Sequence, residues 1–305
     1  MEQRIWRSAF SGQYYRQPSS RVFEAQIIQP GDISAIEAVT ILDEVLGLAR
    51  PQYRLRQVCR LVRMDNLRAR VPIVTKLTGQ EKVPPLVEAE ISAEAYSEVD
   101  FDLWKNVVHV ALSDEAVKQA AHDILALHVA DAARDLARME NKQIAAELPS
   151  ATDQAAGGAW DAMTGGVSDN DPFDDLLTAF TTLEGNGYPA SWAVMHPKVW
   201  NAFITNTFVR ELVKAGIATI TAVGGQFTVP GYPTVKVCVD SATTPDTSCY
   251  VLSSEAPTLV LGEGPTEAAR YRDEKAGYDA YIIRQWLQPQ LVLSDAIREI
   301  TGAHS

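Results

Sequence analysis

The sequence predicts an α+β fold in which one long helix joins a charged β-hairpin to a compact lobe of helices and strands. Residues 113–148 contain no glycine or proline and include ten alanines, so they predict a single helix. At about 1.5 Å per residue this helix spans roughly 50 Å, which is long for a globular protein. In the C-terminal half, helices and strands follow one another without the regular βαβ alternation of a doubly wound sheet.

The first 52 residues predict an N-terminal arm followed by a short helix. Residues 1–31 are polar, aromatic and mildly basic and lack periodicity, which is typical of an arm rather than of a packed domain. Asp32 is a suitable N-cap, and the apolar residues after it recur at helical spacing. We expect this helix to end near Gly47.

Charge then separates along the chain into two limbs. Residues 50–70 hold seven arginines against Asp65, and residues 81–102 hold seven carboxylates against Lys82. In both limbs apolar and charged residues alternate as they do in strands, and the linker TKLTGQEKVPP supplies the turn. The simplest structure is a long hairpin with one basic and one acidic limb.

Two uses of this hairpin remain open. A lone two-stranded hairpin is marginal in water, so it should lie on another surface, such as that of a neighbouring copy. Alternatively, its charges form a solvated face with internal pairs worth about 0.2 to 1 kcal/mol each.

The long helix should begin at the N-cap Ser113 and carry an apolar stripe for packing. A Gly-rich linker follows Pro149, and Asp171 and Pro172 then provide an N-cap and a first helical residue. After that helix we expect the strand SWAVM, a helix that starts at Pro197, and short strands in GGQFTVPGYPTVKVCVD and SCYVLSS. The last 49 residues, from 257 on, predict long strands that reverse near Gly277.

Charge, cysteine spacing and hydropathy argue against several classes of protein. The net charge of −12 argues against general attraction to nucleic acid or anionic membranes. The three cysteines have no metal or redox spacing and indicate buried thiols, with a pairing of Cys238 and Cys249 as a minor alternative. The N-terminal residues lack a signal-peptide core, and no window approaches 18 apolar residues, so we expect a cytosolic protein without a membrane span.

The usual catalytic motifs are absent. The chain has no G-x-S-x-G, P-loop, dinucleotide-binding or H-E-x-x-H pattern, and its five histidines are scattered. The run DNDPFDD departs from the calcium-loop pattern and is better explained by helix capping. We therefore expect no catalytic residue, no cofactor and no metal.

Three segments of the sequence, in this order, carry a resemblance to a known protein family: WAVMHPKVW, VPGYPTVKVCV and YIIRQWLQPQLVLSDAIREI. With the preceding arm, hairpin and long helix, residues 32–301 resemble the major capsid proteins of tailed double-stranded DNA viruses, which have the Hong Kong 97 type of fold. The resemblance implies four parts. They are an N-terminal arm and short helix (1–52), an extended loop (53–108), a peripheral domain (109–170 and 257–305) with a spine helix (113–148), and an axial domain (171–256).

In that family the axial domains meet at the centre of pentamers and hexamers, and the extended loop reaches over an adjacent subunit. The resemblance thus implies a coat protein that self-assembles into an icosahedral virion shell around double-stranded DNA without reading its sequence. Scaffold, portal and decoration proteins would be further partners, and assembly would take place in the host cytoplasm. The implied contact residues between subunits are Arg54, Arg56, Arg68, Arg70, Lys76, Lys82, Glu88, Glu90 and Glu94.

Two alternatives remain. An encapsulin-like compartment shell shares this fold, although the basic and aromatic arm offers no clear cargo-binding helix. A cytosolic α+β enzyme without a recognisable motif would not explain the charge-split hairpin or the long helix.

Overall fold

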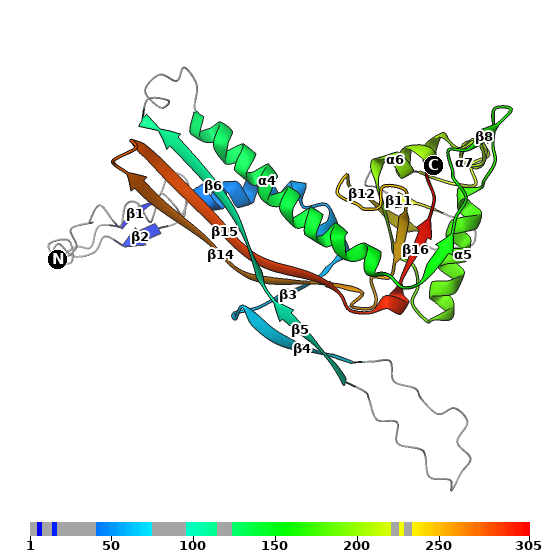
Figure 1. The fold of residues 1–305 in the computed structure, drawn as a ribbon, viewed down its shortest axis with the longest axis horizontal. Coiled ribbons are helices and arrows are strands. Elements are labelled where there is room, and N and C mark those ends of the chain that lie inside the picture. Colours follow the sequence, from blue (N-terminus) through cyan, green and yellow to red (C-terminus); the bar gives the residue numbers. More distant parts are fainter. Residues whose placement is uncertain are drawn as a thin grey trace, which may run out of the picture.

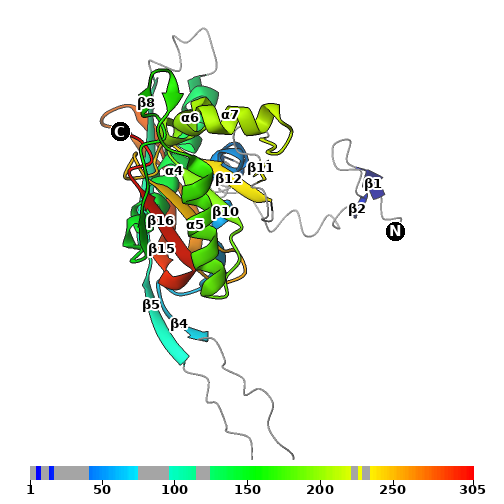
Figure 2. The same cartoon turned by 90° about the vertical axis from the view of Figure 1, so that its right-hand side faces the viewer.

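The computed structural model describes residues 5–7, 14–16, 41–74, 96–114, 124–220, 226–228 and 234–305. Its described part forms an elongated body from which a two-stranded hairpin extends (Figures 1 and 2). One half of the body is a long helix on a four-stranded sheet, and the other half is a six-stranded sheet with three helices. The α+β fold class predicted from the sequence is confirmed.

The four-stranded sheet has the order β3-β14-β15-β6. Its strands are β3 (Arg60–Arg63), β14 (Leu259–Asp273), β15 (Tyr278–Leu291) and β6 (Trp104–Ser113). β14 and β15 form the long antiparallel pair expected near the C-terminal end, and their reversal contains Gly277 at φ +64°. Because β3 and β6 lie at the two edges, the chain on both sides of the extended hairpin is anchored in one sheet.

The helix α4 (Ile124–Glu147) runs along this sheet beside β6 and β15 (Figure 1). Its alanines allow close packing, since Ala132, Ala133 and Ala137 are all buried in a core shared with β15. The amides of Asn106 on β6 and Gln143 on α4 exchange two hydrogen bonds of 3.1 and 2.8 Å. The expected spine helix is thus confirmed over 124–147; residues 115–123 lie outside the described part.

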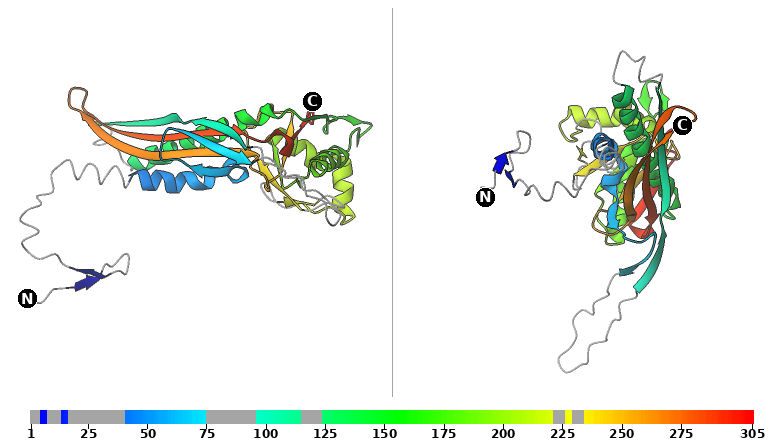
Figure 3. Two further views of the ribbon diagram at one scale, coloured as in Figure 1. Left: turned by 90° about the horizontal axis from the view of Figure 1, so that it is seen from below. Right: turned by 90° about the vertical axis from the view of Figure 1, so that its left-hand side faces the viewer.

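Residues before the sheet give two further elements. Strands β1 (Ile5–Arg7) and β2 (Tyr14–Arg16) pair antiparallel within the predicted arm. Residues 41–49 are helical, so the short helix runs two residues past Gly47 before the 3-10 turns η1 (Arg50–Gln52) and η2 (Leu55–Val58). This helix and α4 lie on the same side of the sheet (Figure 3).

The six-stranded sheet has the order β11-β12-β10-β13-β16-β7. Its strands are β11 (Gln226–Phe227), β12 (Val235–Val239), β10 (Trp192–Met195), β13 (Cys249–Leu252), β16 (Ile297–Thr301) and β7 (Gln154–Ala156). One face is covered by α5 (Pro172–Gly185), α6 (Pro197–Thr205) and α7 (Thr207–Lys214). A small hairpin of β8 (Met163–Thr164) and β9 (Val167–Ser168) and the turns η3 (Leu148–Ser150) and η4 (Ser294–Ala296) complete the described elements.

The C-terminal half lacks the regular βαβ alternation of a doubly wound sheet, as expected, but it contains one crossover of that kind. β10 and β12 pair in parallel, and the chain between them passes through α6 and α7. A parallel pair requires a crossover of this kind, and here two short helices supply it. The pattern was hidden because the short β11 strand intervenes before β12.

Helix capping explains the DNDPFDD run, as expected. The Asp171 carboxylate accepts a 2.9 Å hydrogen bond from the Phe173 amide, and Pro172 occupies the first turn of α5. His196 caps α6 in the same way, because its Nδ1 accepts from the Lys198 amide at 3.2 Å. These two side chains therefore have structural roles.

The two halves share a continuous core. The second face of the six-stranded sheet contributes Val194, Tyr250 and Ile297, and these pack with Ile144 of α4 and Leu261 of β14. In addition, β7 and β16 belong to the six-stranded sheet, although they fall in the predicted peripheral ranges 109–170 and 257–305. Likewise β6 begins at residue 104, inside the predicted loop range 53–108. The boundaries between the two halves therefore depend on which sheet each strand joins. The chain passes between the two sheets more often than its composition suggests.

All three cysteines are free thiols. β10 lies between β12 and β13, so Cys238 and Cys249 are not on neighbouring strands. Burial raises the pKa of each thiol. Within the described residues no helix has the length and apolar character needed to cross a membrane.

Candidate intersubunit surface: the charged hairpin

The extended hairpin consists of β4 (Arg68–Val74) and β5 (Tyr96–Asp102), which pair antiparallel over seven residues. Its register places Arg68 opposite Asp102 and Arg70 opposite Asp100. The predicted union of a basic limb with an acidic limb is therefore confirmed for these strands. The two strands lead away from the body of the molecule (Figure 2).

Ion pairs cross the hairpin directly. Arg68 pairs with Asp102 at 2.7 Å, and Arg70 pairs with Asp100 at 2.8 Å and with Glu98 at 3.4 Å. All five side chains are more than half exposed. Exposed pairs contribute little to stability and exchange partners readily, so these charges are available to another surface at small cost.

The root of the hairpin is apolar and buried. Phe101 and Leu103 pack on β14 with Met64 and Val260, and the Leu103 amide donates a 2.8 Å hydrogen bond to the Leu67 carbonyl. Gly264 allows this approach, because a Cβ at this position would lie 2.8 Å from a Leu103 methyl carbon. The hairpin is thus fixed where it leaves the sheet.

A buried charge cluster lies beside this root. The Arg56 guanidinium pairs with Glu140 of α4 at 3.1 Å and with Glu263 of β14. Gln285 of β15 donates a 3.2 Å hydrogen bond to the second Glu140 oxygen, and Arg56 lies 4.9 Å from the Tyr53 ring centre. One arginine therefore ties the segment before the hairpin to both the spine helix and the sheet.

The electrostatics of this cluster are unusual at Glu140. Its side chain is fully buried, and burial raises its pKa to about 7, although Arg56 and Gln285 act in the opposite direction. The like charge of Glu263 adds to the increase. Burial also raises the pKa of the Tyr53 phenol. Two carboxylates thus compete for one guanidinium.

The nine predicted contact residues fall into three groups. Arg68 and Arg70 lie on the exposed hairpin, where the internal pairs foreseen as the alternative are present. Arg56 is in the buried cluster, and Arg54 donates a 3.2 Å hydrogen bond to the Val239 carbonyl. The others lie outside the described residues: Lys76, Lys82, Glu88, Glu90 and Glu94. A role between subunits stays a prediction for all nine.

Sequence reasoning missed the Glu140 cluster and the partners of the two hairpin arginines. Glu140 follows Leu136 by four residues, so the apolar stripe of the helix contains a carboxylate at its next position. That break in the stripe was the available signal. Among the described residues no group of three histidine, cysteine or acidic side chains could hold a metal ion.

Comparison with solved structures identifies the type of fold. The chain matches the capsid of cyanophage P-SCSP1u with a TM-score of 0.62 and 13% identity, over 81% of this chain and 87% of the other. It matches a virus-like particle from Pyrococcus furiosus with a TM-score of 0.58 and 11% identity, over 85% and 96%. The SrpI encapsulin complex from Synechococcus elongatus PCC 7942 matches with a TM-score of 0.55 and 13% identity, over 83% and 88%. The fold is that of Hong Kong 97-like capsid proteins.

A family comparison connects the sequence to this fold. No curated protein matches the chain in sequence. The family model described as phage capsid protein, however, matches residues 110–295, which is more than half of the chain. These residues include α4, the last four residues of β6 and the long β14–β15 pair. Members of this group are structural shell proteins rather than enzymes. The chain belongs to the phage capsid protein family.

Proposed function

We propose that the chain is a major capsid protein that assembles as pentamers and hexamers into an icosahedral shell around packaged double-stranded DNA. The family match over residues 110–295 is the observation that carries this proposal. The six-stranded lobe corresponds to the axial domain, which would meet its copies at the centre of each ring. The described hairpin strands, which lead away from the body, would reach a neighbouring subunit (Figure 1).

The charge of the chain suits an enclosed genome. A net charge of −12 per copy gives the shell a weakly repulsive lining, which lets packaged DNA spool without adhering. DNA would therefore be enclosed without sequence-specific contacts. A scaffold, a portal and decoration proteins would be further partners, and the shell would form in the host cytoplasm.

An encapsulin-like compartment is the second candidate, favoured by the structural match to the SrpI encapsulin complex. Both candidates require a closed shell and differ in its contents. The DNA candidate is preferred because the matching family model describes phage capsid proteins.

The test is assembly of the purified full chain. Size-exclusion chromatography and negative-stain microscopy, with and without its scaffold, should show rings or closed shells. A chain that stays monomeric at every salt and pH tried, scaffold included, contradicts both shell proposals. The ratio of nucleic-acid to protein absorbance in native particles then separates a genome container from a protein compartment.

A further inference from the structure

Several buried polar atoms around Arg56 have no hydrogen-bond partner among the described residues. They are the Tyr53 hydroxyl, Arg56 Nε, Glu140 Oε1 and Gln285 Oε1, and they make up four of the nine such side-chain atoms in the described part of the chain. Arg56 Nε lies 3.1 Å from Glu140 Oε1, but without the alignment of a hydrogen bond. Because buried polar groups are nearly always paired in native proteins, this gathering of unpaired atoms calls for an explanation.

A proton on Glu140 would satisfy most of these atoms. The Gln285 amide nitrogen donates a 3.2 Å hydrogen bond to Glu140 Oε2, and the Gln285 side chain also faces the Tyr53 phenol. A protonated Glu140 is a hydrogen-bond donor. With the amide turned over, the Gln285 oxygen can accept from both this acid and the Tyr53 hydroxyl. The neutral form of Glu140 therefore suits the cluster better than the ionised form does.

Arg56 separates Glu140 from solvent. The Glu140 side chain is 0% exposed, whereas the side chains of Arg56 and Glu263 beside it are 22% and 19% exposed. An outward movement of the η2 turn, which carries Arg56, would therefore bring water to Glu140. An ionised Glu140 gains from that movement, because a buried carboxylate is costly unless it is well paired and hydrogen-bonded.

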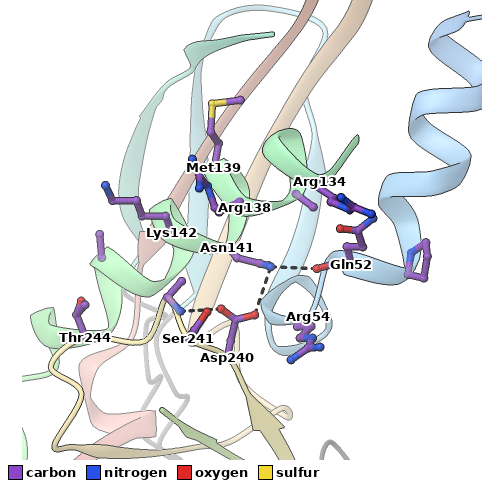
Figure 4. A pocket seen from close by; sticks show the side chains of 14 residues that line it. Gln52, Arg54, Arg134, Arg138, Met139, Asn141, Lys142, Asp240, Ser241 and Thr244 are labelled. Carbon is purple, nitrogen blue, oxygen red and sulfur yellow. Dashed lines mark hydrogen bonds between the residues drawn. The ribbon is translucent and has the colours of Figure 1, made fainter. Parts of the chain in front are cut away.

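A second contact, which involves no proton exchange, holds the same segment on α4. The Asn141 amide nitrogen donates a 3.0 Å hydrogen bond to the Gln52 carbonyl (Figure 4), and the Asn141 oxygen accepts a 3.3 Å hydrogen bond from the Leu55 amide. Neither of these bonds involves a titratable group. The helix α4 thus holds the η1–η2 segment through a neutral contact at Asn141 and a charged contact at Glu140.

Four titratable or charged groups face Glu140: Arg56 of η2, Tyr53 and Cys59 on either side of that turn, and Glu263 of β14. Burial raises the pKa of the Tyr53 phenol and of the Cys59 thiol, so both keep their protons at neutral pH, and the guanidinium keeps its charge. Burial raises the pKa of Glu140 to about 7, and the like charge of Glu263 adds to this increase. Glu140 therefore changes its charge near neutral pH.

We propose that Glu140 and Arg56 form a proton-controlled latch between the spine helix and the segment that leads into the hairpin. While Glu140 holds its proton, the η2 turn stays closed on α4. When Glu140 releases the proton to solvent, η2 moves outward and water reaches the carboxylate. Because β3 begins two residues after η2 ends, the latch sets how firmly the chain before the hairpin is held. This inference goes beyond the proposed function and does not require that copies assemble.

The direction of the effect follows from proton linkage. The pKa of Glu140 is about 7 in the closed cluster and 4.5 in water, so the closed form binds the proton more tightly. Opening of η2 therefore becomes easier as the pH rises between these values and levels off above pH 7. Between pH 6 and pH 8 the population of the open form should increase about tenfold.

Native-state hydrogen exchange of the purified, unassembled full chain tests the latch. The reporters are the Leu55 amide, bonded to Asn141 Oδ1, and the Cys59 amide, which donates a 3.2 Å hydrogen bond to the Arg56 carbonyl. After correction for intrinsic rates, their protection should fall about tenfold from pH 6 to pH 8 through an opening that low concentrations of urea do not promote. The buried amides of β10 should exchange only through the urea-sensitive global opening.

Two variants separate the charged contact from the neutral one. Glu140→Gln has no proton to lose, so the protection of Leu55 and Cys59 through the local opening should be the same at pH 6 and pH 8. The matched control Asn141→Ser removes the neutral contact instead. It should lower this protection by the same factor at both pH values and keep the tenfold difference between them.

Infrared spectroscopy gives a readout that does not depend on a variant that folds. The carbonyl band of a buried carboxylic acid should be present in the wild type at pH 6 and disappear by pH 8. The latch is overturned if this band is absent at pH 6, or if Glu140→Gln keeps the tenfold difference in protection. It is also overturned if Leu55 and Cys59 exchange only together with β10, because Glu140 would then affect global stability alone.

Discussion

Arginine and carboxylate pairs occur in two neighbouring regions of this molecule with opposite consequences. On the hairpin, Arg68 and Arg70 face their partners in solvent. At the root, Arg56 joins the fully buried Glu140 to Glu263. An exposed pair is worth little because water competes for both charges, whereas breaking a buried pair leaves a charge that water cannot reach. The same residue types thus fix the root and leave the hairpin charges available for exchange.

The apolar root should show the largest effect. Phe101→Ala removes a fully buried ring beneath the hairpin and should lower the free energy of unfolding by about 4 kcal/mol. Urea unfolding followed by circular dichroism measures this. The control Leu67→Ala removes a half-exposed side chain nearby and should cost less than about 1 kcal/mol. Equal losses for both would show that the root is no better packed than the hairpin surface.

The buried cluster should come next. Arg56→Met leaves Glu140 and Glu263 without their cation and should cost about 3 kcal/mol of stability at pH 8. Adding Glu140→Gln removes one of the stranded charges, so the double variant should be more stable than the sum of the single effects predicts. A strictly additive result in this double-mutant cycle would rule out the proposed coupling.

Glu140 should also make the stability of the root depend on pH. Its pKa is about 7 when folded and 4.5 when unfolded, so the folded chain binds the proton more tightly. The contribution to stability is therefore full below about pH 4.5 and is lost as the pH rises to 7, by about 3 kcal/mol at most.

The measurement is the difference in unfolding free energy between wild type and Glu140→Gln across this pH range. That difference should fall with rising pH, since only the wild type loses a proton at this site. The matched control Glu255→Gln removes an exposed carboxylate and should give a flat difference. A flat difference for Glu140→Gln as well would refute the raised pKa.

The smallest effect on folding is expected on the hairpin. Arg68→Gln/Arg70→Gln should change the free energy of unfolding by less than about 1 kcal/mol, because the lost pairs are exposed. Arg68→Glu/Arg70→Glu should likewise leave the monomer folded but block shell formation, seen by negative-stain microscopy. Normal shells from the reversed variant would remove these arginines from the interface between subunits.

Local features of the fold could be predicted from the sequence. The alanine-rich run, the charged alternation and the Asp171-Pro172 pair each depend on neighbouring residues, and the long helix, the hairpin and the α5 cap follow from them. Sheet membership could not be derived in this way. β16 and β7 pair with each other in the six-stranded sheet although more than 140 residues of chain separate them. Nothing in their short sequences indicates this pairing.

The candidate site, too, could be predicted from the sequence only in part. Arg68 and Arg70 were identified from charge alternation, but their partners depend on a strand register that composition does not set. Glu140 was hidden because a carboxylate on an apolar helix face has meaning only once Arg56, distant in sequence, is packed against it.

The β14–β15 ribbon has a mechanical consequence. Leu261 and Leu287 anchor it in the core shared with the six-stranded lobe, while Ala268 and Ile283 lie under the spine helix. A pull along the length of the molecule would therefore load the backbones of both strands in parallel, while the cross-strand hydrogen bonds keep the two strands aligned. The ribbon is suited to carry tension along the subunit and to keep its length constant when the contents of a shell press outward.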